Sequence, residues 1–228
     1  MDALIRQPLF YIYFIYGVSF LVMAYVIFRG IRRATSMVLV TTFWVLAAFG
    51  LTHGIREMLD WVGFIVESGA HARVAWLELL SDAFLIVSYV ILLQFAVNLL
   101  SYRSERRKAY RMIPGLLVAA GIVAIVATGS HDSHQVGLWV RHSFGFAGAL
   151  LSGVAFCKLA VAMRAIGNTR VEVGLLLGAV GFIAYSVFGG LIVTTVAGQP
   201  VQIFRALCAF TIAAASILIL GIFRQAEA

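Results

Sequence analysis

The chain is organised as long apolar runs separated by short polar segments. Runs of about 20 apolar residues, which cross about 30 Å of hydrocarbon when helical, can be placed at 9–28, 35–60, 75–100, 112–130, 138–162, 172–196 and 201–223. The last two runs are divided only by Gly198, Gln199 and Pro200, and such a Gly/Pro cluster ends a helix and begins a turn. The pattern predicts an all-α fold, a polytopic membrane bundle of seven transmembrane helices.

The composition supports this class and argues against two others. Hydrophobic residues make up 62% of the chain and charged residues only 12%, which excludes a water-soluble domain of useful size. The net charge of +7 is spread over short basic clusters between the apolar runs. That distribution is typical of loops on the cytoplasmic side of a membrane and not of a protein that binds nucleic acid.

The distribution of lysine and arginine predicts the orientation of the bundle. Of the 17 basic residues, twelve fall on one predicted side: Arg29, Arg32, Arg33, Arg103, Arg106, Arg107, Lys108, Arg111, Lys158, Arg164, Arg170 and Arg224. The positive-inside rule therefore predicts an outer N-terminus and a cytoplasmic C-terminus. We expect a multi-pass membrane protein, with the lipid bilayer as its first partner.

Charged and imidazole side chains gather at the predicted outer ends of four runs. Such residues are costly in a membrane, so they usually face the bundle interior and mark function. They are His53, Arg56, Glu57 and Asp60 in the second run, Glu78 and Asp82 in the third, Arg141 and His142 in the fifth, and Arg205 in the seventh. The candidate site is therefore in the outer half of the bundle.

Two of these pairs have the spacing of residues on one helix face. His53 and Glu57 are four residues apart, as are Glu78 and Asp82, so each pair is within reach of a common ion. Together with His142 they favour zinc, iron, copper or manganese. In this interpretation Arg56, Asp60, Arg141 and Arg205 surround the ligands without binding the metal.

Three other interpretations of the cluster stay open. His53 and His142 could be the axial ligands of haem b, with room beside them at Gly50, Gly54, Gly145 and Gly148. The arginines and carboxylates could form salt bridges that only hold helices together. The cluster could also bind a small polar or anionic ligand. A retinal Schiff base is excluded, because the seventh run contains no lysine.

The segment Leu46–Trp61, with the sequence LAAFGLTHGIREMLDW, resembles a segment of the N-terminal membrane domains of bacterial sensor histidine kinases and diguanylate cyclases, L-x-A-F-G-L-x-H-G-x-x-E-W. A looser similarity continues into Ser88–Ala96, and the whole covers roughly a third of the chain. Met58 stands where those proteins usually have tryptophan.

The resemblance implies that residues 1–228 are one transmembrane sensor domain, the N-terminal part of a longer two-component signalling protein. It implies a homodimer in a bacterial inner membrane, whose last helix continues into a cytoplasmic output module, and a domain without catalytic residues of its own. His53 and Glu57 are the residues that it marks. No ligand is implied by it.

The leading hypothesis is a sensor that binds a metal, haem or small ligand in its outer half and signals through its last helix. The alternative is a membrane redox protein or metalloenzyme that uses His53, Glu57, Glu78, Asp82 and His142. A small transporter fits less well, because the ionisable residues lie at one level and do not form a trail through both halves.

Overall fold

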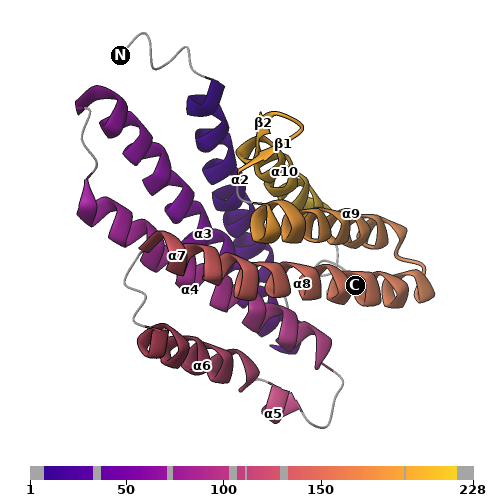
Figure 1. The fold of residues 1–228 in the computed structure, drawn as a ribbon. Coiled ribbons are helices and arrows are strands. Elements are labelled where there is room, and N and C mark those ends of the chain that lie inside the picture. The colour runs from indigo at the N-terminus through magenta and orange to yellow at the C-terminus, as the bar shows by residue number, and fades with distance from the viewer. Residues whose placement is uncertain are drawn as a thin grey trace.

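The computed structural model describes residues 8–32, 37–70, 74–102, 107–110, 112–128, 133–192 and 194–219. Within these ranges the chain is helical apart from one two-stranded hairpin (Figure 1). The α-helices are α2 (Pro8–Ile31), α3 (Met37–Ala70), α4 (Ala75–Leu100), α5 (Arg107–Tyr110), α6 (Ile113–Thr128), α7 (Ser133–Val140), α8 (Phe146–Ala165), α9 (Thr169–Tyr185) and α10 (Val201–Ile219). Two π-helical segments, η1 (Arg141–Gly145) and η2 (Ser186–Leu191), continue α7 into α8 and extend α9.

The all-α prediction is confirmed in the described residues. Five helical segments are long and apolar enough to cross a membrane: Pro8–Ile31, Ala75–Leu100, Gln135–Ala165, Thr169–Leu191 and Val201–Ile219. α3 and α6 occupy the other two predicted runs. Some boundaries differ from the prediction, since α3 continues to Ala70 and the helix of the fifth run begins at Ser133.

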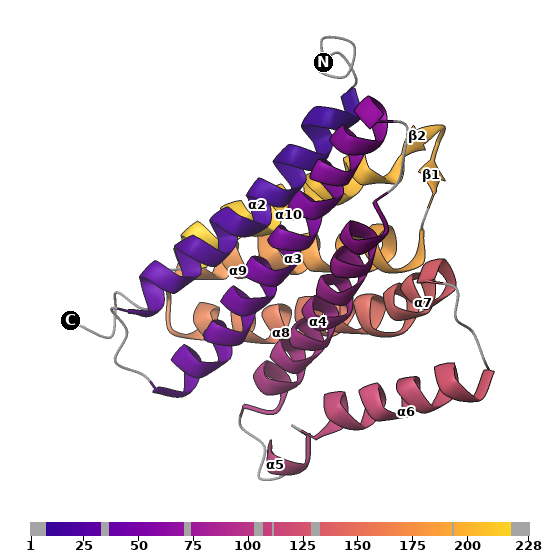
Figure 2. The same ribbon diagram turned by 90° about the vertical axis from the view of Figure 1, so that its left-hand side faces the viewer.

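Six of the long helices form a closed ring. Each packs against the next in the order α2, α3, α4, α8, α9 and α10, and α10 returns to α2. α6 lies outside the ring, at an angle to α4, and contacts it (Figure 2). The first and last long helices of the described chain are therefore neighbours, and the side chains that face inward share one interior.

Aromatic rings fill the middle of the ring. Phe49 from α3 lies 5.4 Å from Phe20 of α2 and 6.5 Å from Phe182 of α9, between ring centroids. Phe156 of α8 makes edge-to-face contacts with Phe95 of α4 and with Phe182. All five side chains are fully buried, so apolar packing closes the interior at this level.

The turn predicted at Gly198–Pro200 is a short antiparallel hairpin, β1 (Thr195–Val196) and β2 (Gln199–Pro200). Its two turn residues, Ala197 and Gly198, have φ angles of 49° and 75°, the left-handed region that tight hairpin turns require. The hairpin joins η2 to α10 and marks one end of the ring, which we call the hairpin end.

Candidate functional site

A polar cavity of about 340 Å³ lies at the hairpin end of the ring. Its walls come from α2, α3, α4, α7, η1 and α10, so helices from both halves of the chain build it. The charged residues that line it are Arg56, Glu57 and Asp60 from α3, Glu78 and Asp82 from α4, Arg141 from η1 and Arg205 from α10. Tyr13 and Tyr16 of α2 and Gln202 of α10 add polar groups.

The charges of α3 are paired mainly with one another. Arg56 donates a hydrogen bond to Glu57 and forms an ion pair with Asp60, in which Nη2 and Oδ2 are 2.6 Å apart. Asp60 in turn accepts a hydrogen bond from Ser81 of α4 at 2.5 Å, which ties the two helices together. Two buried atoms of this group, Arg56 Nε and Glu57 Oε2, have no hydrogen-bond partner among the described residues.

The other two arginines are held by neutral groups. Arg205 donates from Nε to the carbonyl of Phe188 at 2.6 Å and from Nη2 to that of Ile192 at 2.9 Å. Arg141 donates from Nη1 to the hydroxyl of Tyr89 at 3.5 Å. Both side chains are buried, and in the part of the chain that the structure describes neither forms an ion pair with a carboxylate.

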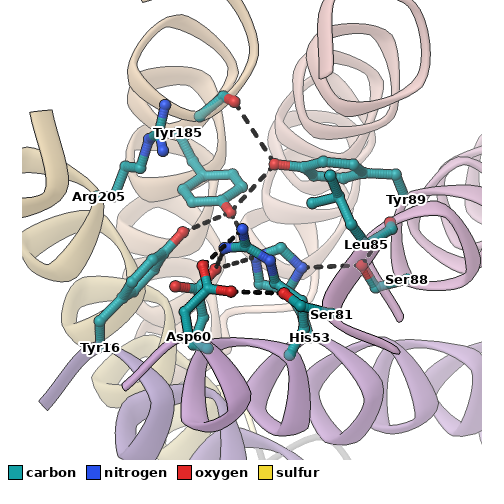
Figure 3. Close-up of polar contacts among 12 residues, drawn as sticks. Tyr16, His53, Asp60, Ser81, Leu85, Ser88, Tyr89, Tyr185 and Arg205 are labelled. Carbon is teal, nitrogen blue, oxygen red and sulfur yellow. Dashed lines mark hydrogen bonds and ion pairs between the residues drawn. The ribbon is translucent and has the colours of Figure 1, made fainter. Parts of the chain in front are cut away.

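A chain of hydrogen bonds leads from the cavity into the ring. The hydroxyls of Tyr16 and Tyr185 are 2.7 Å apart, Tyr185 is 2.7 Å from His53 Nε2, and His53 Nδ1 is 2.9 Å from Ser88 Oγ. Figure 3 shows these four side chains pointing toward one another from α2, α9, α3 and α4. All four are buried, so the chain runs through the packed interior of the ring.

The end of this chain fixes the direction of its donors. Ser88 donates to the carbonyl of Leu85 at 2.9 Å, and a carbonyl can only accept. The Ser88 oxygen therefore accepts from His53 Nδ1–H, which leaves Nε2 as the acceptor for Tyr185. Tyr185 then accepts from Tyr16. With His53 as a neutral imidazole, this sequence of bonds presents an oxygen lone pair of Tyr16 at the cavity.

Both π-helical segments border the site. η1 packs against η2, and η2 supplies carbonyls to two side chains, Phe188 to Arg205 and Gly189 to Tyr89. A Cβ at Gly190 would lie 2.7 Å from Phe146 Cα and 2.8 Å from its backbone nitrogen, so only glycine lets η2 approach α8 this closely. π-helical turns are rare and frequent at functional sites.

The predicted site residues divide into the charged residues, which line the cavity, and the two histidines, which do not. Glu57, Glu78 and Asp82 line the cavity, as do the four residues expected to surround a metal: Arg56, Asp60, Arg141 and Arg205. His53 is buried next to the cavity, 3.4 Å from Glu57 through Nε2. His142 is exposed, with Nε2 3.3 Å from the carbonyl of Leu191. On η1, therefore, Arg141 lines the cavity and the adjacent His142 is directed away from it.

The arrangement of the described residues does not support the metal and haem hypotheses. No group of three or more histidine, cysteine, aspartate or glutamate side chains in the described ranges is arranged to hold a metal ion. Both ring nitrogens of His53 are engaged in hydrogen bonds. Atoms of neighbouring helices also fill the space expected for haem beside the four glycines. Met23 lies against Gly50, Leu21 against Gly54, Tyr89 against Gly145, and Leu92 and Leu93 against Gly148.

Four residues of the hydrogen-bond network were not predicted from the sequence: Tyr16, Ser88, Tyr89 and Tyr185. Tyrosines are expected at membrane interfaces, and Tyr16, Tyr89 and Tyr185 lie well inside their apolar runs. That position was a usable signal, because a phenol hydroxyl buried in a span needs a partner.

The chain matches no protein family, no curated protein and no solved structure. The resemblance around His53 to sensor domains therefore stays a prediction. The function has to be inferred from the geometry of the cavity and of the hydrogen-bond chain beside it.

Proposed function

We propose that the protein is the membrane-embedded input domain of a bacterial signalling protein, which binds a small ligand in the cavity at the hairpin end and signals through α10. The observation that carries this proposal is the double role of Arg205. Its side chain lines the cavity, and it is also hydrogen-bonded to η2 and the residue after it through Phe188 and Ile192. A change in the cavity therefore acts directly on the last helix.

The coupling has a simple physical basis. A ligand that attracts Arg205 competes with the carbonyls of Phe188 and Ile192 for its N–H groups. Occupancy then alters the contact between α10 and η2, and helix shifts of about 1–2 Å at such contacts are an established means of switching. A ligand moves the equilibrium only as far as it prefers one arrangement, which places the strongest effects on residues that it touches.

The proposal includes seven spans, an outer N-terminus and a cytoplasmic C-terminus. It is supported by the five apolar helices, by the apolar sequence of α6 and by the excess of lysine and arginine on one side. The hairpin end then faces outward, and the far end of α10 faces the cytoplasm. A homodimer and a cytoplasmic output module of the histidine-kinase or cyclase kind complete the proposal.

A chimera tests the signalling role without knowledge of the ligand. Residues 1–228 are fused in place of the membrane domain of a sensor histidine kinase, and autophosphorylation is measured in membranes. Arg205→Gln removes the link between cavity and η2, and we expect it to change kinase activity at least about fivefold. Arg170→Gln, at an exposed position of α9, is the matched control and should leave the activity unchanged.

Equal activity of the parent chimera and the Arg205→Gln variant, at equal amounts in the membrane, would contradict the proposal. A kinase that is inactive in every chimera would contradict it too, provided that the same kinase is active with its own membrane domain. A similar change in the Arg170→Gln variant would show that the activity responds to any lost charge and not to the cavity.

A further inference from the structure

We propose that the cavity binds a small zwitterion, with the ligand's carboxylate held by Arg141 and Arg205 and its ammonium group held by the carboxylates of α3 and α4. Amino acids are the simplest members of this class. The inference rests on the proposed function, because it names the ligand of the same cavity. It is carried by the separation of the two kinds of charge around the cavity wall.

The positive side of the wall consists of η1 and α10. Arg141 and Arg205 are buried there without an ion-paired carboxylate among the described residues. Arg205 uses Nε and Nη2 for backbone carbonyls, and Arg141 uses Nη1 for Tyr89. A guanidinium has five N–H donors, so each retains donors for the cavity. Two such groups match the geometry of a carboxylate.

The negative side of the wall consists of α3 and α4. Four carboxylates line it, those of Glu57, Asp60, Glu78 and Asp82, together with the guanidinium of Arg56. Glu57 is almost completely buried, yet its Oε2 has no hydrogen-bond partner in the described part of the chain. A buried carboxylate oxygen without a donor is costly, and the positive charge of a ligand's ammonium group in the cavity would offset part of that cost.

The floor of the cavity favours the same group. Tyr16 donates its hydrogen to Tyr185 in the chain that ends at Ser88, so its oxygen is available as an acceptor. Tyr16 lines the cavity. An ammonium group therefore meets Tyr16 and the carboxylates as acceptors, whereas a second anionic group would be repelled by those carboxylates.

The charges of the two walls and the volume of the cavity narrow the class of ligand that can bind. A simple anion would be attracted by two arginines but repelled by the carboxylates of the facing wall, and a simple cation would face the reverse problem. A molecule that carries both charges satisfies both walls. A water molecule in the liquid occupies about 30 Å³, so a cavity of about 340 Å³ holds a ligand of amino-acid size and excludes a macromolecule.

Binding is tested on the full chain in detergent by thermal unfolding and by equilibrium dialysis. The twenty standard L-amino acids are the probes. Propionate and ethylamine, the single-charge analogues of L-alanine, are the controls at equal ionic strength. We expect at least one amino acid to bind saturably and to raise Tm, because a ligand that binds only the folded state stabilises it. Neither propionate nor ethylamine should do so at the same concentration.

Variants assign the two ends of the ligand. Arg141→Gln and Asp82→Asn should each weaken binding of that amino acid at least tenfold, while Arg164→Gln, an exposed residue of α8 far along the chain from the cavity lining, should not. Where a buried variant fails to fold, Asp82→Asn decides, because Asp82 is only partly buried. Unchanged affinity in a folded Asp82→Asn variant would overturn the assignment of the ammonium site.

The remaining outcomes separate this inference from the proposed function. Binding of propionate or of ethylamine as tightly as any amino acid, or no binding by any of the twenty, would overturn the zwitterion. A kinase chimera that responds to Arg205→Gln would still support signalling in that case. Amino-acid binding without any effect of Arg205→Gln on the kinase would support the site and overturn its role in signalling.

Discussion

The hydroxyl of Tyr185 donates to Nε2 of His53 over 2.7 Å, although the two residues are 132 positions apart in the chain. This bond joins α9 to α3 across the interior of the ring. His53 continues to Ser88 of α4, and Tyr185 continues to Tyr16 of α2. Four helices are therefore held in register by one line of polar contacts, and each contact can be tested separately.

Removal of the Tyr185 hydroxyl should destabilise the protein. The Tyr185→Phe variant keeps the ring but leaves His53 Nε2 and the Tyr16 hydroxyl without their partner, and an orphaned buried group costs about 1–3 kcal/mol. The free energy of unfolding in detergent measures the effect. Tyr25→Phe is the control, because Tyr25 is exposed and, among the described residues, only Arg29 donates to it, at 3.4 Å. Equal stability of the two variants would argue against the buried hydrogen-bond chain from Tyr16 to Ser88.

The direction of the hydrogen bonds predicts the tautomer of His53. Nδ1 should carry the proton and Nε2 should accept, because Ser88 uses its own hydrogen for Leu85. Solid-state NMR of protein labelled with ¹⁵N-histidine reads the two nitrogens separately, and a His53→Gln variant assigns the signal. If Nε2 carries the proton instead, donors and acceptors along the hydrogen-bond chain are reversed, and the Tyr16 oxygen is no longer available as an acceptor at the cavity.

Gly190 should tolerate no side chain. In a Gly190→Ala variant the new Cβ meets backbone atoms of Phe146 at 2.7–2.8 Å, and overpacking of this kind costs about 1–3 kcal/mol. Gly115→Ala is the control in α6, where nothing lies within 4 Å of the added carbon. There alanine should be neutral or stabilise the helix by up to about 1 kcal/mol. Unfolding of both variants in detergent checks the contrast.

The orientation and the crossing of α6 can be tested with single cysteines. Gln135→Cys and Tyr110→Cys, both at exposed positions on either side of α6, are introduced after replacement of Cys157 and Cys208 by alanine. A membrane-impermeant maleimide applied to intact spheroplasts should label position 135 and not position 110. Equal labelling of both would contradict a crossing by α6, and the reverse result would contradict the proposed orientation.

Chelation should leave the fold unchanged. No described group of potential ligands is arranged around a metal position, so Tm with and without EDTA should agree within error. Metal analysis of the purified protein provides the second readout. A stoichiometric metal that is lost in a His53→Ala variant would restore the metal hypothesis for His53, Glu57, Asp82 and His142.

The helices were predictable because each apolar run is long and bounded by charges or by a Gly/Pro turn. Most of the charged residues that line the cavity were also predictable from the sequence, since charged residues such as Glu57 and Arg205 avoid lipid. Two features could not be predicted from pattern. The π-helical turns at Arg141–Gly145 and Ser186–Leu191 depend on tertiary packing, and they decide which way Arg141 and His142 point.

The second feature is the way in which the tyrosines meet. The positions of Tyr16 and Tyr185 inside their apolar runs indicate that each hydroxyl needs a partner, but they do not indicate which residue the partner is. Only the ring order of the helices brings α2, α3 and α9 around one point. That order follows from packing over the whole chain and not from any local segment.

The partners of the three cavity arginines also fit the order in which a ribosome makes the chain. Arg56 finds Glu57 and Asp60 on its own helix, so in the proposed seven-span bundle α3 would enter the bilayer with these charges already matched. Arg141 donates to Tyr89, and Arg205 to carbonyls of Phe188 and Ile192, all synthesised earlier. Each arginine of the cavity therefore has its described partners on its own helix or on a segment that is synthesised before it.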